Sequence, residues 1–303
     1  MILSRISFDV SVNVFLPLFY AHVVFDAHKL SPSDLVLTQL TLLTLANLLI
    51  LLTLGIPETM SVWGLGNFLD DVGCKLLMYL YRVARGLAIC TTCLLSIFQA
   101  VTISPGIPGW ARIKLKLQRA ILPSCFLSWI FNLFVGAGAP MYVTGPRNGS
   151  SFRSALDLKY CTEVPVSAAT TLINAIVLSL RDLFFVVLMC MASGYMVWVM
   201  QRHLRVPGRR PPGVMPEVRA AKSVVALVTL YILLYGRQSI MFSVLLNRKE
   251  NYPALVNSHV VFSLTFSALS PFLMIHNDRR MRTDMTCSHK VPLGALEREF
   301  PYS

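Results

Sequence analysis

Long runs of apolar residues, separated by short polar segments, extend along almost the entire chain. A bilayer core about 30 Å thick is crossed by a helix of roughly 20 apolar residues, so runs of this length predict membrane-spanning helices. Seven runs are long enough, and they lie approximately at residues 6–25, 35–56, 76–104, 120–144, 169–200, 223–246 and 254–276. The pattern therefore predicts an all-α membrane protein, with a seven-transmembrane helix bundle in residues 1–282 and a short tail at 283–303.

Four prolines lie within the predicted spans. They are Pro17, Pro123, Pro140 and Pro271. A transmembrane bundle tolerates such residues, because neighbouring helices and local distortions satisfy the carbonyl oxygens that a proline leaves without a donor. The prolines are therefore compatible with seven helices.

The composition also indicates a membrane protein. Hydrophobic residues make up 55% of the chain and charged residues 14%, with a mean hydropathy of +0.61, whereas a soluble domain carries roughly 25% charged residues. The net charge of +12 mainly reflects topology, because the loops on the C-terminal side hold most of the Lys and Arg residues. We therefore expect the N-terminus outside and the C-terminus in the cytosol, with the lipid bilayer as a partner and no groove for nucleic acid.

The predicted orientation places two kinds of extracellular feature in the outer loops. The sequon Asn148-Gly149-Ser150 would receive a glycan there. Cys74 and Cys161 also lie outside, in an oxidising compartment where a disulfide persists. Glycosylation at Asn148 and a Cys74–Cys161 disulfide are therefore predicted.

Enzyme signatures are weak. Cys90 and Cys93 form a C-x-x-C pair, but the pair lies deep in a span without a second pair of ligands, so packing is favoured over zinc or redox chemistry. The chain contains neither H-E-x-x-H nor G-x-S-x-G, and it has no phosphate-binding glycine loop. Seven spans do not divide into the two equal halves of an inverted-repeat transporter. We therefore expect a protein that is not an enzyme and needs no metal or cofactor.

Two switches of rhodopsin-like receptors are absent. The third span ends Phe98-Gln-Ala-Val-Thr-Ile-Ser-Pro105 without Asp-Arg-Tyr, and the seventh ends Ser270-Pro-Phe-Leu-Met-Ile275 in place of Asn-Pro-x-x-Tyr. Other segments are distinctive, namely HKLSPSDLVLTQL (28–40), GIPETM (55–60), DDVGCKLLMYLYRVARG (70–86), TTCLLSIFQAVTISP (91–105), MASGYMVWVMQRH (191–203), EVRAAKSVVALV (217–228) and SPFLMI (270–275). From about residue 12 to 282 the sequence closely resembles the vomeronasal type-1 receptors, the pheromone receptor family of G-protein-coupled receptors.

The resemblance implies a multi-pass plasma-membrane receptor that binds a small pheromone-like ligand and signals through a heterotrimeric G protein of the inhibitory type. Two features depart from the family pattern. Val12 replaces a glycine beside Asn13, and the second span looks about three residues longer between Gln39 and Ala46, which would rotate one part of that helix. A non-functional or poorly trafficked receptor relic, and a bitter-taste-type receptor, are the alternatives.

Charged residues within the spans indicate a binding site. Arg82, Arg85, Arg181 and Arg237 lie in predicted spans, whereas Asp182 is the one evident acid among them. An intramembrane arginine is costly and normally faces the bundle interior or a watered cavity, and guanidinium groups bind carboxylate, sulfate and phosphate oxygens. We therefore expect an anionic ligand in the outer half of the bundle. The alternative is a scaffold in which Arg181 pairs with Asp182.

Apolar side chains near these arginines complete the predicted pocket, because ligand pockets are mostly apolar with a few polar anchors. The predicted ligand-binding residues are Tyr79, Arg82, Val83, Arg85, Arg181, Phe184, Phe185, Arg237, Gln238 and Phe242. Bundle packing or lipid contact is the alternative for each aromatic residue.

Basic residues gather at the predicted cytosolic mouth of the bundle. The residues expected to contact the G protein are Arg112, Lys114, Arg202, Arg219 and Lys222. Attraction to anionic lipid, at about 1 kcal/mol per charge, is the alternative explanation for them.

Overall fold

A computed structural model of the chain describes residues 10–19, 22, 32–64, 68–104, 108–145, 156–158, 160–163, 168–205, 218, 221–234, 261 and 264–273. These residues are almost entirely helical, with one small three-stranded sheet. Four helical stretches are long and apolar enough to cross a membrane, and they are Leu35–Ser61, Asp71–Ile103, Arg112–Met141 and Ile176–Arg202. Three shorter apolar helices, Val10–Phe19, Ala221–Leu234 and Leu264–Leu273, overlap the first, sixth and seventh predicted spans. The prediction of an all-helical membrane protein is confirmed.

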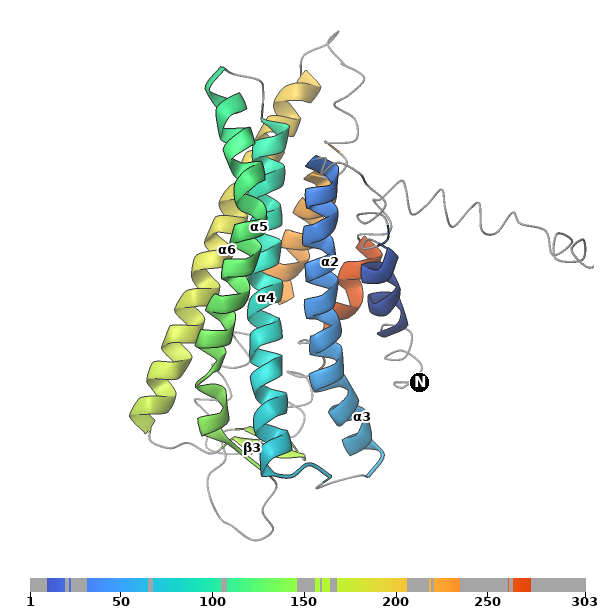
Figure 1. Cartoon of the computed structure of the whole chain (residues 1–303), viewed down its shortest axis with the longest axis vertical. Helices are drawn as coiled ribbons and strands as arrows, with labels where there is room; N and C mark the ends of the chain where they lie inside the picture. The colour runs from blue at the N-terminus through green and yellow to red at the C-terminus, as the bar shows by residue number, and fades with distance from the viewer. Residues whose placement is uncertain are drawn as a thin grey trace, which may run out of the picture.

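Helix α4 (Asp71–Ile103) is the centre of the bundle. It packs against α2 (Pro32–Ile50), α5 (Pro108–Gly136) and α6 (Ala168–Arg205) (Figure 1). Most of its side chains are buried, whereas much of the surface of α5 and α6 is apolar and exposed. Exposed apolar surface is expected where a helix faces lipid, and α4 is instead enclosed by protein.

The second span extends beyond its predicted end. Helix α2 continues through a π-helix (Leu51–Gly55) into α3 (Ile56–Val62). In a regular α-helix, Pro57 would have no N–H to donate to the Thr53 carbonyl oxygen, and its ring would clash with that carbonyl. The π-helix widens the helix at this point and so avoids the clash. The Ile56 N–H accordingly bonds to the Leu51 carbonyl oxygen. The helix therefore continues to Val62, six residues beyond the predicted end of this span at residue 56, because it accommodates the proline.

The fourth span begins and ends earlier than predicted. Helix α5 starts at Pro108 and carries its basic residues as a helical extension, with Pro123 inside it. It ends at Gly136, and Gly138 then precedes a short 3₁₀ helix (Ala139–Tyr142). Pro140 therefore lies in this 3₁₀ helix, near the end of the apolar stretch Arg112–Met141. Glycine is less favourable than alanine in a helix by about 1 kcal/mol, and Gly136 and Gly138 lie where the α-helix gives way to the 3₁₀ helix.

The small sheet lies at the end of the bundle that the sequence predicts to be extracellular, which is called the outer end below; the opposite end is called the inner end. Strands β1 (Val143–Thr144), β2 (Leu156–Leu158) and β3 (Cys161–Glu163) pair antiparallel in the order β1-β3-β2. Figure 1 shows β3 beside the start of α4. A sheet of this size is not stable alone, so its position depends on what fastens it to the helices.

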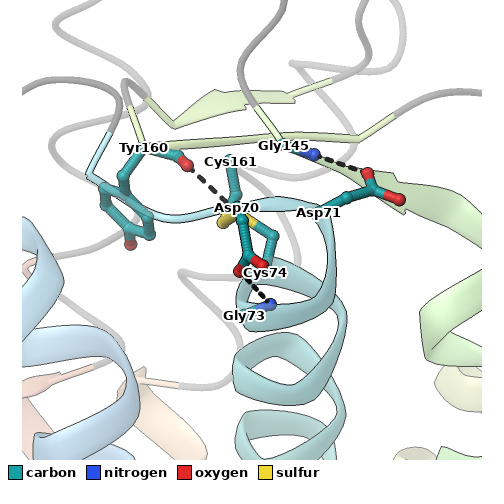
Figure 2. Close-up of a disulfide and its surroundings, with 7 residues drawn as sticks. All are labelled: Asp70, Asp71, Gly73, Cys74, Gly145, Tyr160 and Cys161. Atoms are coloured by element: carbon teal, nitrogen blue, oxygen red, sulfur yellow. Dashed lines mark hydrogen bonds between the residues drawn. A yellow bond between two sulfur atoms is a disulfide. The ribbon is translucent and has the colours of Figure 1, made fainter.

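Two connections fasten the sheet to α4, one a disulfide and the other a hydrogen bond (Figure 2). Cys161 is bonded to Cys74, which is the pair that the sequence analysis joins. Asp71 accepts a hydrogen bond of 2.9 Å from the Gly145 N–H. The preceding Asp70 caps α4 by accepting a bond of 2.8 Å from the Gly73 N–H, which satisfies one of the free donors at the helix start.

Buried amides connect the first, second and seventh predicted spans. The Asn13 side-chain amide donates to the Ser267 carbonyl oxygen at 3.2 Å, and Asn47 donates to the Ser270 hydroxyl at 2.8 Å. All four residues are fully buried. The Val10–Phe19 and Leu264–Leu273 helices are therefore held beside α2 by directional contacts (Figure 1).

We predict that Cys161→Ser lowers stability by about 2–5 kcal/mol, because it opens a loop whose ends are 87 residues apart. The melting temperature of the detergent-solubilised protein and its surface level in cells measure the effect. Cys190→Ser is the control, since Cys190 is exposed and unbonded and its replacement should change neither quantity. Equal stability of the two variants would contradict the prediction.

Candidate functional site

A charged cluster joins α4 and α6 within the membrane-spanning region. Arg181 contacts the Asp182 carboxylate twice through the same oxygen, from Nε at 2.9 Å and from a terminal nitrogen at 2.6 Å. Arg85 contacts the other oxygen of Asp182 at 3.4 Å. Two guanidinium groups thus share one carboxylate. The Arg181–Asp182 scaffold pair is present, and Arg85 is added to it from a second helix.

The two arginines are held unequally. The Arg181 side chain is 10% exposed and that of Asp182 is 6% exposed, whereas the Arg85 side chain is 29% exposed and has the longer contact. Tyr81, one helical turn before Arg85 on α4, is buried in the bundle core, and the contact from Arg85 to Asp182 crosses to α6, so this group faces the bundle interior. Arg85 is therefore the more accessible cation of the cluster.

Helix α5 supplies a neutral extension of the cluster. The Asn132 oxygen accepts a contact of 3.5 Å from Arg181, and its amide nitrogen donates to the Ser128 carbonyl at 2.8 Å and to the Cys90 sulfur at 3.4 Å. Gly86 makes room for this arrangement, because a Cβ there would overlap the Asn132 oxygen. The cluster therefore links α4, α5 and α6.

The side chains of Tyr79 and Val83 face α5, whereas Arg85 contacts α6. The Tyr79 hydroxyl contacts the Leu133 carbonyl at 3.4 Å, and both side chains lie against Gly136 of α5. They occupy the side of α4 that packs on α5. Arg82 lies between the two sides, half-buried and engaged in an interaction of its own.

The aromatic pair of α6 is divided between lipid and protein. Phe184 is 60% exposed, whereas Phe185 is half-buried, packs on the core and contacts Phe131 edge-on with ring centroids 6.5 Å apart. Of the two phenylalanines, Phe185 is therefore the one that packs against the other helices. The remaining predicted ligand contacts, Arg237, Gln238 and Phe242, lie outside the described residues, as does Asn148.

The predicted G-protein contacts differ in their surroundings. Arg112, Arg202 and Lys222 are exposed, and Arg202 stacks over the Trp198 ring at 5.4 Å. Lys114 instead donates to the Thr102 carbonyl at 2.8 Å and to the Ser104 carbonyl at 3.3 Å. Its ammonium group thereby satisfies the free carbonyl oxygens at the end of α4. Arg219 lies outside the described residues.

A direct contact joins α4 and α6 at this inner end. The Ser104 and Tyr195 hydroxyls are 2.7 Å apart.

Across the described part of the chain, no group of three His, Cys, Asp or Glu side chains could hold a metal ion.

Sequence reasoning missed Asn132, Gly86 and Tyr81. An amide in an apolar span is itself a signal, because intramembrane polar groups normally face the bundle interior. A helical glycine and a tyrosine beside many other apolar residues carry no comparable signal. Their roles follow from contacts between helices.

We predict that Gly86→Ala destabilises the protein by about 1–3 kcal/mol, because the new methyl group displaces Asn132 and crowds Arg181. Gly194→Ala is the matched control, since nothing lies within 4 Å of its Cβ position, and alanine favours a helix by up to about 1 kcal/mol. Melting temperatures of the solubilised variants distinguish the two. A Gly86→Ala variant as stable as the Gly194→Ala variant would refute the packing argument.

Comparison with known proteins identifies the family. The model of the vomeronasal organ pheromone receptor family matches residues 1–286. The chain is 35% identical to olfactory receptor class A-like protein 1 of Danio rerio over 289 residues, which cover 94% of this chain and 90% of that protein. It is 35% identical to vomeronasal type-1 receptor 4 of Homo sapiens over 284 residues, covering 92% and 93% of the two chains. It is 33% identical to vomeronasal type-1 receptor 3 of Homo sapiens over 301 residues, covering 96% and 94%. The chain belongs to the vomeronasal organ pheromone receptor family, and it is a multi-pass plasma-membrane receptor and not an enzyme.

Proposed function

We propose that this receptor binds a small, anionic, pheromone-like ligand in the outer half of its bundle and activates an inhibitory-type heterotrimeric G protein. The observation that carries the proposal is the charge imbalance of the buried cluster, in which Arg85 and Arg181 share the single carboxylate of Asp182. At 1.5 Å per residue Arg85 lies about 16 Å below Cys74, a depth that a small ligand reaches from outside.

The geometry favours Arg85 as the anchor of the ligand. A carboxylate or sulfate that approaches Arg85 competes with a contact of 3.4 Å, whereas Arg181 holds Asp182 at 2.6 Å. Asp182 thus keeps a partner when Arg85 turns to the ligand. Leaving a buried charge without a partner would cost several kcal/mol, and this arrangement avoids that cost.

The basic residues of the inner end suit a role in G-protein binding. Arg112, Arg202 and Lys222 are exposed and free of the capping role that Lys114 has on α4. We include Arg219 in this surface on the basis of its sequence position. Lys114 would act through the position of the end of α4.

The proposal includes seven spans, an extracellular N-terminus and a glycan on Asn148. The positions of the three shorter helices, together with the distribution of Lys and Arg, support this topology. The disulfide to Cys161 supports it as well, since such bonds persist in an oxidising compartment.

Arg85→Ala is expected to weaken the response to anionic agonists by about 10- to 100-fold, because a charged hydrogen bond contributes roughly 1.5–3 kcal/mol. Arg85→Lys keeps the charge but loses the planar fork, so its response should be intermediate. G-protein activation in cells with matched surface levels measures both. Lys75→Ala removes an exposed outer cation that pairs with Asp71 and is the control. Parent-like responses of Arg85→Ala to every agonist would exclude the anchor.

A tag at the N-terminus should be detected on unpermeabilised cells, and glycosidase should increase the gel mobility of the parent but not of Asn148→Gln. An intracellular, unglycosylated protein would instead support a poorly trafficked receptor relic. Surface delivery of a Val12→Gly variant, which restores the glycine of the family pattern, would then identify the first span as the cause.

A further inference from the structure

Tyr160 has a buried hydroxyl that the described part of the fold does not use. The side chain is fully buried, and its hydroxyl has no hydrogen-bond partner among the described residues. Phenylalanine would fill the same space without the polar atom, and burying such an atom without a partner costs free energy. The hydroxyl therefore calls for a partner that the described part of the receptor does not supply.

The position of Tyr160 is firmly set. It precedes Cys161, which is bonded to Cys74 at the start of α4, and β3 follows directly. Its ring packs against Phe68 with centroids 6.3 Å apart. Figure 2 shows the side chain extending from the outer loop toward the helices. The disulfide and the contact with Phe68 therefore fix the position from which the hydroxyl points toward the helices.

The buried residues around Tyr160 include one that lies close to the charged cluster. Tyr160 and Tyr81 of α4 belong to the same buried core of the bundle, and Tyr81 lies one helical turn before Arg85. Burial, with a smaller contribution from Glu58, raises the pKa of Tyr160 above its usual range. The hydroxyl therefore keeps its proton and can donate it in a hydrogen bond.

We propose that the Tyr160 hydroxyl donates a hydrogen bond to a second polar group of the ligand, an acceptor oxygen at the end remote from the anion. This inference rests on the proposed function, in which Arg85 binds the anionic end. Tyr160 adjoins the disulfide to Cys74, and Arg85 lies about three helical turns, roughly 16 Å, below Cys74. This separation favours a rigid and mostly apolar anion with a hydroxyl or carbonyl oxygen at its far end.

Three probes separate the two contacts. The first is a hydroxybiphenylcarboxylate with its hydroxyl and carboxylate at opposite ends, the second is the same acid without the hydroxyl, and the third is the methyl ester of the first. The full-length receptor and its Tyr160→Phe variant are compared by G-protein activation at matched surface levels. We expect Tyr160→Phe to reduce the potency of the first probe about five- to tenfold, as the loss of one hydrogen bond predicts, and to leave the second unchanged.

Stability distinguishes recognition from structure. Because the hydroxyl has no partner to lose among the described residues, Tyr160→Phe should melt at the parent temperature or above it. Tyr195→Phe is the contrasting variant, since its hydroxyl is paired with Ser104; it should lose stability and keep the preference for the first probe. Lower stability or a lower surface level of Tyr160→Phe would assign the hydroxyl to the fold and overturn the inference.

The remaining outcomes are also decisive. Equal potency of the first two probes on the parent and on Tyr160→Phe excludes the second contact, and a weaker ester would then leave Arg85 as the anchor. An ester as potent as the acid, and indifferent to Arg85→Ala, would refute the anionic site itself. If none of the probes activates the parent receptor, the ligand class named here is wrong.

Discussion

The balance of buried charge around Asp182 constrains the whole bundle. A guanidinium in the membrane interior costs about 2.5–3.5 kcal/mol on insertion scales unless it is paired or hydrated, and two such groups meet one carboxylate here. The pairing requires α4 and α6 to remain adjacent and in register. It also requires α5 to approach closely enough for Asn132 to reach Arg181, and only a residue without a side chain at Gly86 permits that approach. The ionic group around Asp182 therefore requires α4, α5 and α6 to pack in this arrangement.

The outer and inner ends of the bundle are fastened by different means. At the outer end a disulfide, a small sheet and the cap on α4 act together, and the Cys74–Cys161 bond holds the loop irrespective of small movements of the helices. At the inner end the described contacts are single hydrogen bonds, between Ser104 and Tyr195 and from Lys114 to the end of α4. A receptor needs an outer end that presents a constant surface to ligands and an inner end that can rearrange, and this distribution of bonds provides both.

The sequence predicted what depends on composition and missed what depends on contacts between helices. The third and fifth spans were located well because their apolar runs are continuous and α4 and α6 follow them. The helices of the second and fourth spans end at other residues than the apolar runs do, since a proline is accommodated by the π-helix and α5 ends at Gly136. An excess of intramembrane cations was visible in the sequence, but the unequal pairing of Arg85 and Arg181 depends on distances. Tyr79 and Val83 are near Arg85 in sequence, yet they lie on another side of α4.

Helices α4 and α6 are joined at two levels, and this relates the candidate site to the inner end. Arg85 and Ser104 are on α4, while their respective partners Asp182 and Tyr195 are on α6. Helix α4 has 33 residues, or about 50 Å at 1.5 Å per residue, and it is enclosed for most of this length. In the proposed function, a ligand that competes with Asp182 for Arg85 would weaken the outer of these two polar contacts. The Ser104–Tyr195 hydrogen bond contributes about 0.5–1.5 kcal/mol, and together with the apolar packing of α4 on α6 it opposes separation of the two helices at the inner end.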